Sequence, residues 1–117
     1  MNLITAIIQP AKLGDVKESL AEFGLTGLTV TEVAGHGAQG GSTEYYRGTA
    51  YRVDFLPKIK VELVVDAEQL ESALDAIRSA ARTGEIGDGK LWVTALAHVE
   101  RLRTGEKGSA AVAQVTV

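Results

Sequence analysis

The chain has 117 residues, of which 45% are hydrophobic and 23% are charged, and its formal net charge is −3. This size fits one domain with a single core. The acidic balance argues against a general nucleic-acid binder, the short apolar runs against a membrane span, and the absence of cysteine against a disulfide framework or a thiolate metal site. The N-terminus lacks the pattern of a signal peptide, so we expect a cytoplasmic protein.

The first third of the chain predicts a strand, a helix and a second strand. Residues 3–9 form a short apolar run closed by Pro10, which is typical of a strand. From residue 13 the apolar side chains fall three or four positions apart, and Gly24 stands where a left-handed helix cap belongs. Residues 28–33 are rich in β-branched side chains and alternate, which predicts a second strand leading into a glycine-rich segment.

The same order recurs in the second half of the chain. Residues 59–65 alternate almost strictly, which predicts a third strand with one apolar face. Asp66 and Gln69 form a capping-box pattern, and the helical spacing that follows ends near Arg82. A glycine-rich turn over residues 83–90 precedes a fourth strand at 91–96. We expect a fifth, shorter extended piece to carry Arg101 and Arg103.

This order of elements predicts an α+β fold, the ferredoxin-like βαββαβ sandwich, over residues 1–108, with a C-terminal tail at 109–117. Both helices should cover one face of the sheet. We expect the other face to be apolar as well, through alternate residues of the first, third and fourth strands. A soluble monomer would not leave such a surface in water, so oligomerisation through the sheet is expected.

The segment over residues 35–57 is too long for a simple turn and contains glycines at positions 35, 37, 40, 41 and 48. Three tyrosines and two arginines accompany the glycines, and these residue types are common in contacts between proteins. We interpret residues 37–55 as a flexible recognition loop. A disordered insertion is the alternative.

The glycine-rich turn could bind phosphate, because glycine amides can approach an anion closely and fixed cations can balance its charge. The residues concerned are Gly84, Gly87, Gly89 and Lys90, with Arg101 and Arg103. The glycines follow a helix and precede a strand, so this is not a Walker loop. The pattern alone leaves a phosphate site and a plain glycine-rich turn equally open.

Catalytic patterns are weak in this sequence. The two histidines, His36 and His98, lie far apart and lack the spacing of metal ligands. The central strands lack exposed aromatic residues on which bases could stack, which disfavours an RNA-binding module. We therefore expect a protein that is not an enzyme.

Three stretches of the chain carry a family resemblance: residues 48–58, residues 82–90 with the motif Thr-Gly-Glu-Ile-Gly-Asp-Gly-Lys, and residues 101–106. The chain resembles the PII nitrogen-regulatory signal-transduction proteins over residues 1–108. The resemblance implies a homotrimer of ferredoxin-like subunits with three protruding T-loops. It further implies that ATP and ADP compete for a cleft between neighbouring subunits, and that 2-oxoglutarate joins ATP through Mg²⁺.

The resemblance also implies roles for individual residues. Gln39 would hold Mg²⁺ and 2-oxoglutarate, Lys58 and Gly87 would also contact 2-oxoglutarate, and Tyr51 matches a tyrosine that many relatives have nucleotidylylated. The implied nucleotide-binding residues form two groups. The adenine group is Ile7, Gly27, Thr29 and Val64. The phosphate group is Gly35, Gly37, Gly87, Asp88, Gly89, Lys90, Arg101 and Arg103, together with Ala38, which stands at a position that usually contributes a phosphate contact.

The sequence departs from the family pattern near this site. Ala38 stands where an arginine usually reaches the phosphates, Ala34 and Gly40 stand where lysines are common, and His36 replaces an aromatic residue. A charge-assisted hydrogen bond contributes about 1.5 to 3 kcal/mol, so loss of the arginine alone should weaken ATP binding roughly tenfold or more.

These observations lead to one functional interpretation and two alternatives. Nucleotides and 2-oxoglutarate would select among conformations of the loop, and the loop would dock on a target such as an ammonium transporter, a kinase, an adenylyltransferase or an arginine-pathway enzyme. The first alternative is a divergent PII-like sensor of another small anion or nucleotide. The second, from a different class, is a small phosphotransfer enzyme that uses His36.

Overall fold

The computed structural model describes residues 1–36, 42–46, 49–53 and 55–113. A single-turn 3-10 helix at Pro10–Lys12 leads into the first α-helix. The other elements, in chain order, are β1 (Asn2–Ile8), α1 (Leu13–Ala21), β2 (Thr29–Gly35), β3 (Ser42–Tyr46), β4 (Thr49–Val53), β5 (Leu56–Val65), α2 (Leu70–Ala81), β6 (Lys90–Ala95) and α3 (Ser109–Val112).

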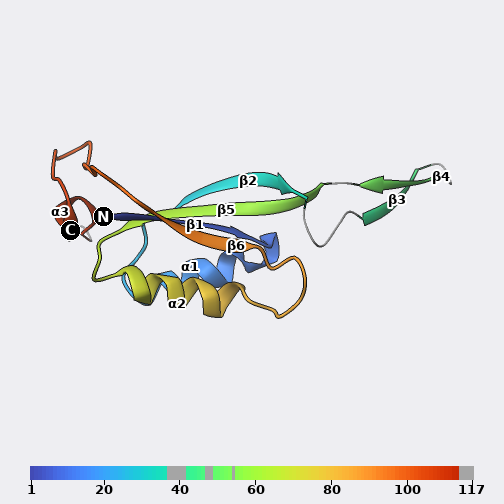
Figure 1. Ribbon diagram of the computed structural model, residues 1–117, viewed down its shortest axis with the longest axis horizontal. Coiled ribbons are helices and arrows are strands. Elements are labelled where there is room, and N and C mark those ends of the chain that lie inside the picture. The colour runs from blue at the N-terminus through green and yellow to red at the C-terminus, as the bar shows by residue number, and fades with distance from the viewer. Residues whose placement is uncertain (37–41, 47–48, 54, 114–117) are drawn as a thin grey trace.

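Four strands form one antiparallel sheet in the order β2-β5-β1-β6. The first and third strands of the βαββαβ order lie at the centre, and the second and fourth lie at the edges. The ferredoxin-like arrangement is therefore confirmed. Both α1 and α2 lie on the same face of this sheet (Figure 1).

The core lies between the sheet and these two helices. Alternation in β5 places Ile59, Val61, Leu63 and Val65 toward the helices, and all four are buried. Val16 and Leu20 of α1 and Ile77 of α2 meet them at helical spacing and are also buried. The predicted helix cap is present, since Gly24 has a φ of 76° and Leu25 donates its N–H to the Leu20 carbonyl at 3.1 Å.

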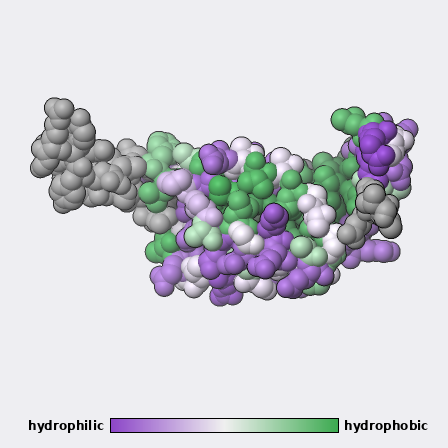
Figure 2. All heavy atoms as spheres, turned by 180° about the vertical axis from the view of Figure 1, so that it is seen from behind, coloured by the Kyte–Doolittle hydropathy of each residue, from purple (hydrophilic) through white to green (hydrophobic). Residues whose placement is uncertain are grey.

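The expectation that the uncovered sheet face is apolar is only partly correct. The strand register places Leu3 and Ile7 on this face with the exposed Trp92, but β5 contributes Lys60 and Glu62. The strict alternation that makes the inner face of β5 apolar leaves its polar residues on the outer face. Figure 2 shows hydrophobic side chains gathered over the strands, with hydrophilic side chains over the helical layer.

The segment predicted as a loop contains a regular hairpin. The strands β3 and β4 pair in antiparallel register, from Ser42 opposite Val53 to Tyr46 opposite Thr49. This hairpin extends away from the main sheet along the long axis of the molecule (Figure 1). Its strands are rich in Thr, Tyr and Val, which favour β structure. These two stretches are therefore strands, whereas residues 37–41, 47–48 and 54 lie outside the described residues, and the role of residues 37–55 as a flexible recognition loop stays a prediction.

The prediction of a fifth extended piece that carries Arg101 and Arg103 is wrong. In the described residues beyond β6, up to residue 113, the pairing is limited to an isolated bridge between Glu100 and Lys107. Between these two residues the chain turns back: Gly105, with a φ of 73°, donates its N–H to the Arg101 carbonyl at 2.7 Å. The following residues form the short helix α3, which the sequence analysis treated as part of a tail.

The capping box before α2 is confirmed and provides a test of helix stability. Gln69 donates its N–H to Asp66 Oδ1 at 2.9 Å, and Asp66 donates its N–H to Gln69 Oε1 at 3.1 Å. We expect Asp66→Ala to lower the free energy of unfolding, measured in urea, by about 1 kcal/mol. Asp75→Ala is the control, because its exposed pair with Arg78 should contribute less than about 0.5 kcal/mol. Equal losses in the two variants would contradict this role of the cap.

Within the described ranges, no helix combines the length and the apolar character that crossing a bilayer requires.

Candidate functional site

The glycine-rich turn between α2 and β6 is built around one carboxylate. Asp88 Oδ2 accepts the backbone N–H groups of Thr83 at 2.8 Å and Gly84 at 2.9 Å. Asp88 Oδ1 accepts the Thr83 hydroxyl at 2.5 Å and Gln9 Nε2 at 3.2 Å. The hydrogen bond from the Thr83 hydroxyl is the main cause of a lowered pKa at Asp88, so this carboxylate is ionised at neutral pH.

Three glycines in the turn have left-handed backbone angles that other residues adopt only with strain. The φ angles are 89° at Gly84, 104° at Gly87 and 91° at Gly89. Gly89 also lies against β1 so closely that a Cβ atom there would stand 1.7 Å from the Ile7 carbonyl oxygen. The turn therefore leads directly into β6, whose first residue, Lys90, pairs with Ile7 of β1.

Lys58 connects this turn to the base of the hairpin. Its Nζ donates to the Gly87 carbonyl at 2.8 Å. Gly35 lies beside the same side chain, since a Cβ at Gly35 would stand 3.1 Å from Lys58 Cγ. Five of the predicted phosphate-side positions and the predicted 2-oxoglutarate lysine thus lie at one end of the sheet: Gly35, Gly87, Asp88, Gly89, Lys90 and Lys58. We call this end the turn end.

A pocket of about 620 Å³ lies at the other end of the sheet, which we call the pocket end. A volume of this size is typical of small-molecule sites. Among the residues that line it are four predicted nucleotide-binding residues, Gly27, Thr29, Val64 and Arg101. Residues 111–113, at and just after the end of α3, form part of the wall.

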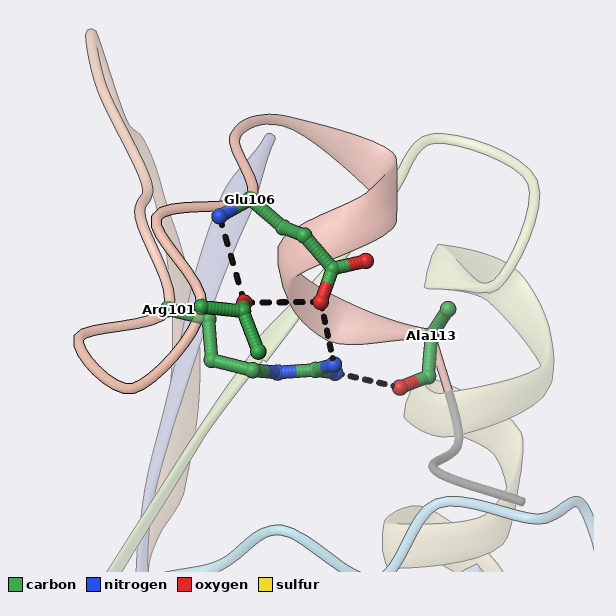
Figure 3. A network of polar contacts seen from close by, with 4 residues as sticks. Arg101, Glu106 and Ala113 are labelled. Atoms are coloured by element: carbon green, nitrogen blue, oxygen red, sulfur yellow. Dashed lines mark hydrogen bonds and ion pairs between the residues drawn. The ribbon is translucent and has the colours of Figure 1, made fainter.

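The guanidinium of Arg101 is held by the chain that follows it. Nη1 donates to Glu106 Oε1 at 3.0 Å, and Nη2 donates to the Ala113 carbonyl at 2.6 Å (Figure 3). The Thr104 hydroxyl donates to Glu106 Oε1 at 2.7 Å and is the main cause of a lowered pKa at Glu106. Arg101 is therefore oriented at the pocket by a carboxylate and a carbonyl. Arg103 lies exposed in the same turn and does not line the pocket.

The turn end and the pocket end are far apart within one chain. Lys58 and Val64 both belong to β5 and are six residues apart, which corresponds to about 20 Å along a strand. Figure 1 shows the turn before β6 at the hairpin side of the sheet and α3 at the opposite side. A phosphate site that combines Lys90 with Arg101 within one chain is therefore not formed, because β6 separates the two residues.

Several predicted residues cannot be placed. Gly37, Ala38, Gln39 and Gly40 lie outside the described residues, so the predicted Mg²⁺ ligand and the missing arginine position are not located. Tyr51 lies in β4 opposite Glu44, and its backbone alone is described. In the described part of the chain, no three His, Asp or Glu residues cluster as metal ligands would.

Two residues of the turn network, Gln9 and Thr83, were not predicted from the sequence. Gln9 was treated only as the end of the first strand, and Thr83 only as part of a motif. The signal for Thr83 was present in part, since a threonine hydroxyl in a turn often accepts the backbone N–H two residues on, as Thr83 does from Glu85 at 3.1 Å. His36 contacts the Phe55 ring, with 5.9 Å between ring centroids, and His98 Nε2 lies 3.0 Å from Glu100 Oε1.

Comparisons with known proteins identify the family. The family model described as "Nitrogen regulatory protein P-II" matches residues 1–106. The chain is 55% identical over 112 residues to "Nitrogen regulatory protein P-II" of Azospirillum brasilense, and this match covers 96% of the chain and 100% of the relative. The identity and coverage are the same for "Nitrogen regulatory protein P-II 1" of Escherichia coli strain K12. The chain therefore belongs to the P-II family of nitrogen regulatory proteins.

Proposed function

We propose that this P-II protein is a cytoplasmic homotrimer without enzymatic activity that senses ATP, ADP and 2-oxoglutarate and regulates target proteins through its projecting hairpin. The observation that carries the proposal is the division of the expected nucleotide residues between two ends of one sheet. Neither the residues at the turn end nor those at the pocket end include all of the expected nucleotide contacts. A site that includes both requires a second copy of the chain.

The uncovered face of the sheet supports the assembly. Trp92 is 46% exposed there and lies beside the half-buried Leu3 and Ile7, which gives a monomer an apolar surface to bury. Copies that pack through this face can bring the turn end of one subunit to the pocket end of its neighbour. The nucleotide would then lie in a cleft between subunits, as the resemblance implies.

The two ends of the sheet suit different parts of a nucleotide. The pocket end offers the apolar Val64 and the polar Thr29 to a base, and Arg101 lines the same pocket. The turn end offers glycine amides and the ammonium group of Lys90 to phosphates. The lack of a side chain at Gly87 permits an anion to approach the backbone closely, whereas at Gly89 it permits the close approach of β1.

The hairpin would respond to the ligand through Lys58. This residue lies at the base of the hairpin and already donates to the Gly87 carbonyl of the phosphate turn. A carboxylate of 2-oxoglutarate, held with Mg²⁺ by Gln39 and the ATP phosphates, would compete for the same ammonium group. Ligand binding would thereby change contacts at the hairpin base and select among hairpin orientations.

The position of Tyr51 fits a site of nucleotidylylation. Its strand β4 belongs to the hairpin that projects from the body of the protein (Figure 1). A modifying enzyme could reach this strand without unfolding the sheet. The added nucleotide would bring bulk and negative charge to the surface that we assign to docking on a transporter, a kinase or an enzyme of nitrogen metabolism.

The ligands can be tested by calorimetry with ATP, ADP and 2-oxoglutarate, added singly and together. We expect ATP and ADP to compete, and 2-oxoglutarate to bind only with ATP and Mg²⁺. Lys58→Ala should lose 2-oxoglutarate while it keeps most of its ATP affinity. A monomer mass by light scattering at micromolar concentration, or no binding of either nucleotide, would contradict the proposal. Binding of another small anion or nucleotide instead would support the divergent-sensor alternative.

A further inference from the structure

The Asp88 carboxylate is fully occupied by its own chain. An ionised carboxylate has about four sites that accept hydrogen bonds, and Asp88 receives four donors. Three donors come from Thr83 and Gly84 at the start of the turn, and the fourth comes from Gln9 just after β1. Its side chain therefore faces inward and leaves little capacity for an outside ligand.

A role inside the turn also agrees with the negative charge of Asp88. A carboxylate close to a nucleotide phosphate would repel it, so an aspartate between Gly87 and Gly89 is a poor direct ligand for that anion. As an internal acceptor it has the opposite effect, because it fixes the backbone of the turn that we propose to bind the anion. The resemblance assigns Asp88 to the phosphates; the geometry assigns its side chain to the turn itself.

The turn is also attached to two strands of the sheet. Gln9 Nε2 connects Asp88 to the end of β1, and Lys58 Nζ connects the Gly87 carbonyl to β5. Directly after these two attachments, Gly89 lies against the Ile7 carbonyl. A segment with several glycines would lose much conformational freedom on closing around an anion, and these contacts impose that cost during folding instead of during binding.

We propose that Thr83 and Gln9 are positioning residues for phosphate recognition, which act through Asp88 to hold residues 84–90 in an anion-binding shape before the ligand arrives. This inference rests on the proposed nucleotide binding. Neither residue is expected to contact the nucleotide. Their effect should appear in the recognition of phosphate and not in the recognition of the base.

The experiment compares ATP with adenosine, which carries the base and ribose but no phosphate. Thr83→Val keeps the branched shape and removes the hydroxyl, whereas Thr83→Ser restores it. We expect Thr83→Val to weaken ATP about tenfold by calorimetry, since it removes a hydrogen bond to a charged group, and Thr83→Ser to recover most of the loss. Gln9→Ala removes a longer hydrogen bond and should weaken ATP by about threefold. Adenosine affinity, followed by NMR titration, should stay unchanged in all three variants.

The control is Ser19→Ala, which removes a hydroxyl hydrogen bond of 3.0 Å to the Ala76 carbonyl, between α1 and α2 and away from the turn. It should leave ATP and adenosine binding unchanged. Native affinity for ATP in Thr83→Val would overturn the inference, and so would an equal loss of ATP and adenosine. Failure of the native chain to bind any adenine nucleotide would instead overturn the proposed function on which the inference rests.

Discussion

Gly89→Ala should abolish measurable ATP and ADP binding and destabilise the fold. The added Cβ would lie 1.7 Å from the Ile7 carbonyl oxygen and 2.8 Å from its carbon. Both are backbone atoms of a central strand, so neither can rotate away as a side chain could. The turn would have to move by more than an ångström, which would displace Lys90 from its register with β1. The left-handed φ of 91° adds about 1 to 2 kcal/mol of strain.

Gly84→Ala separates the two effects. Gly84 has nearly the same φ, 89°, but a Cβ there would meet no atom within 4 Å. We expect it to lose about 1 to 2 kcal/mol of stability and to weaken ATP by no more than about threefold. Urea unfolding and calorimetry on both variants would measure the difference. If both lost ATP equally, backbone strain would explain the result and the close approach to β1 would not.

Local patterns in the sequence were sufficient to predict the sheet and its helices. The alternation in residues 59–65, the capping pair Asp66 and Gln69, and Gly24 are short-range signals, and each has the predicted role. The hairpin was missed although its signal was present. Two runs rich in β-forming residues are separated by only two positions, and the second of these is Gly48. The many glycines before it favoured the loop interpretation instead.

The sequence predicted the residues of the site better than their arrangement in space. Lys90 and Arg101 are both cations near glycines, which favoured one common phosphate site, but β6 crosses the sheet between them. The sequence could not show that Asp88 faces its own turn, because the choice between an inward and an outward carboxylate depends on the positions of Gln9 and Thr83 in space. The helix α3 has only four residues and no capping side chain, so its sequence carries no strong helix signal.

If the proposed site is divided between subunits, two defective chains should complement each other. Lys90→Ala damages the turn end, and Arg101→Ala damages the pocket end. Each variant alone should lose at least about tenfold in ATP affinity, since each removes a charged group that we propose to contact phosphate. In a mixed trimer, one cleft joins the intact turn end of one kind of chain to the intact pocket end of the other kind. That cleft carries neither substitution.

We therefore expect trimers that contain both variants, isolated through two different affinity tags, to bind about one ATP per trimer with native affinity, whichever variant is present twice. This follows because a ring of three chains that contains both variants always has two junctions between unlike chains. One of these joins two intact ends, and the other joins two damaged ends. Mixtures of Lys90→Ala with Gly89→Ala are the control: both changes lie at the turn end, so every cleft keeps a damaged turn and no native binding should return. Calorimetric stoichiometry distinguishes the cases. If Lys90→Ala and Arg101→Ala chains fail to restore a native site together, the two ends of the sheet do not form one site between neighbouring subunits.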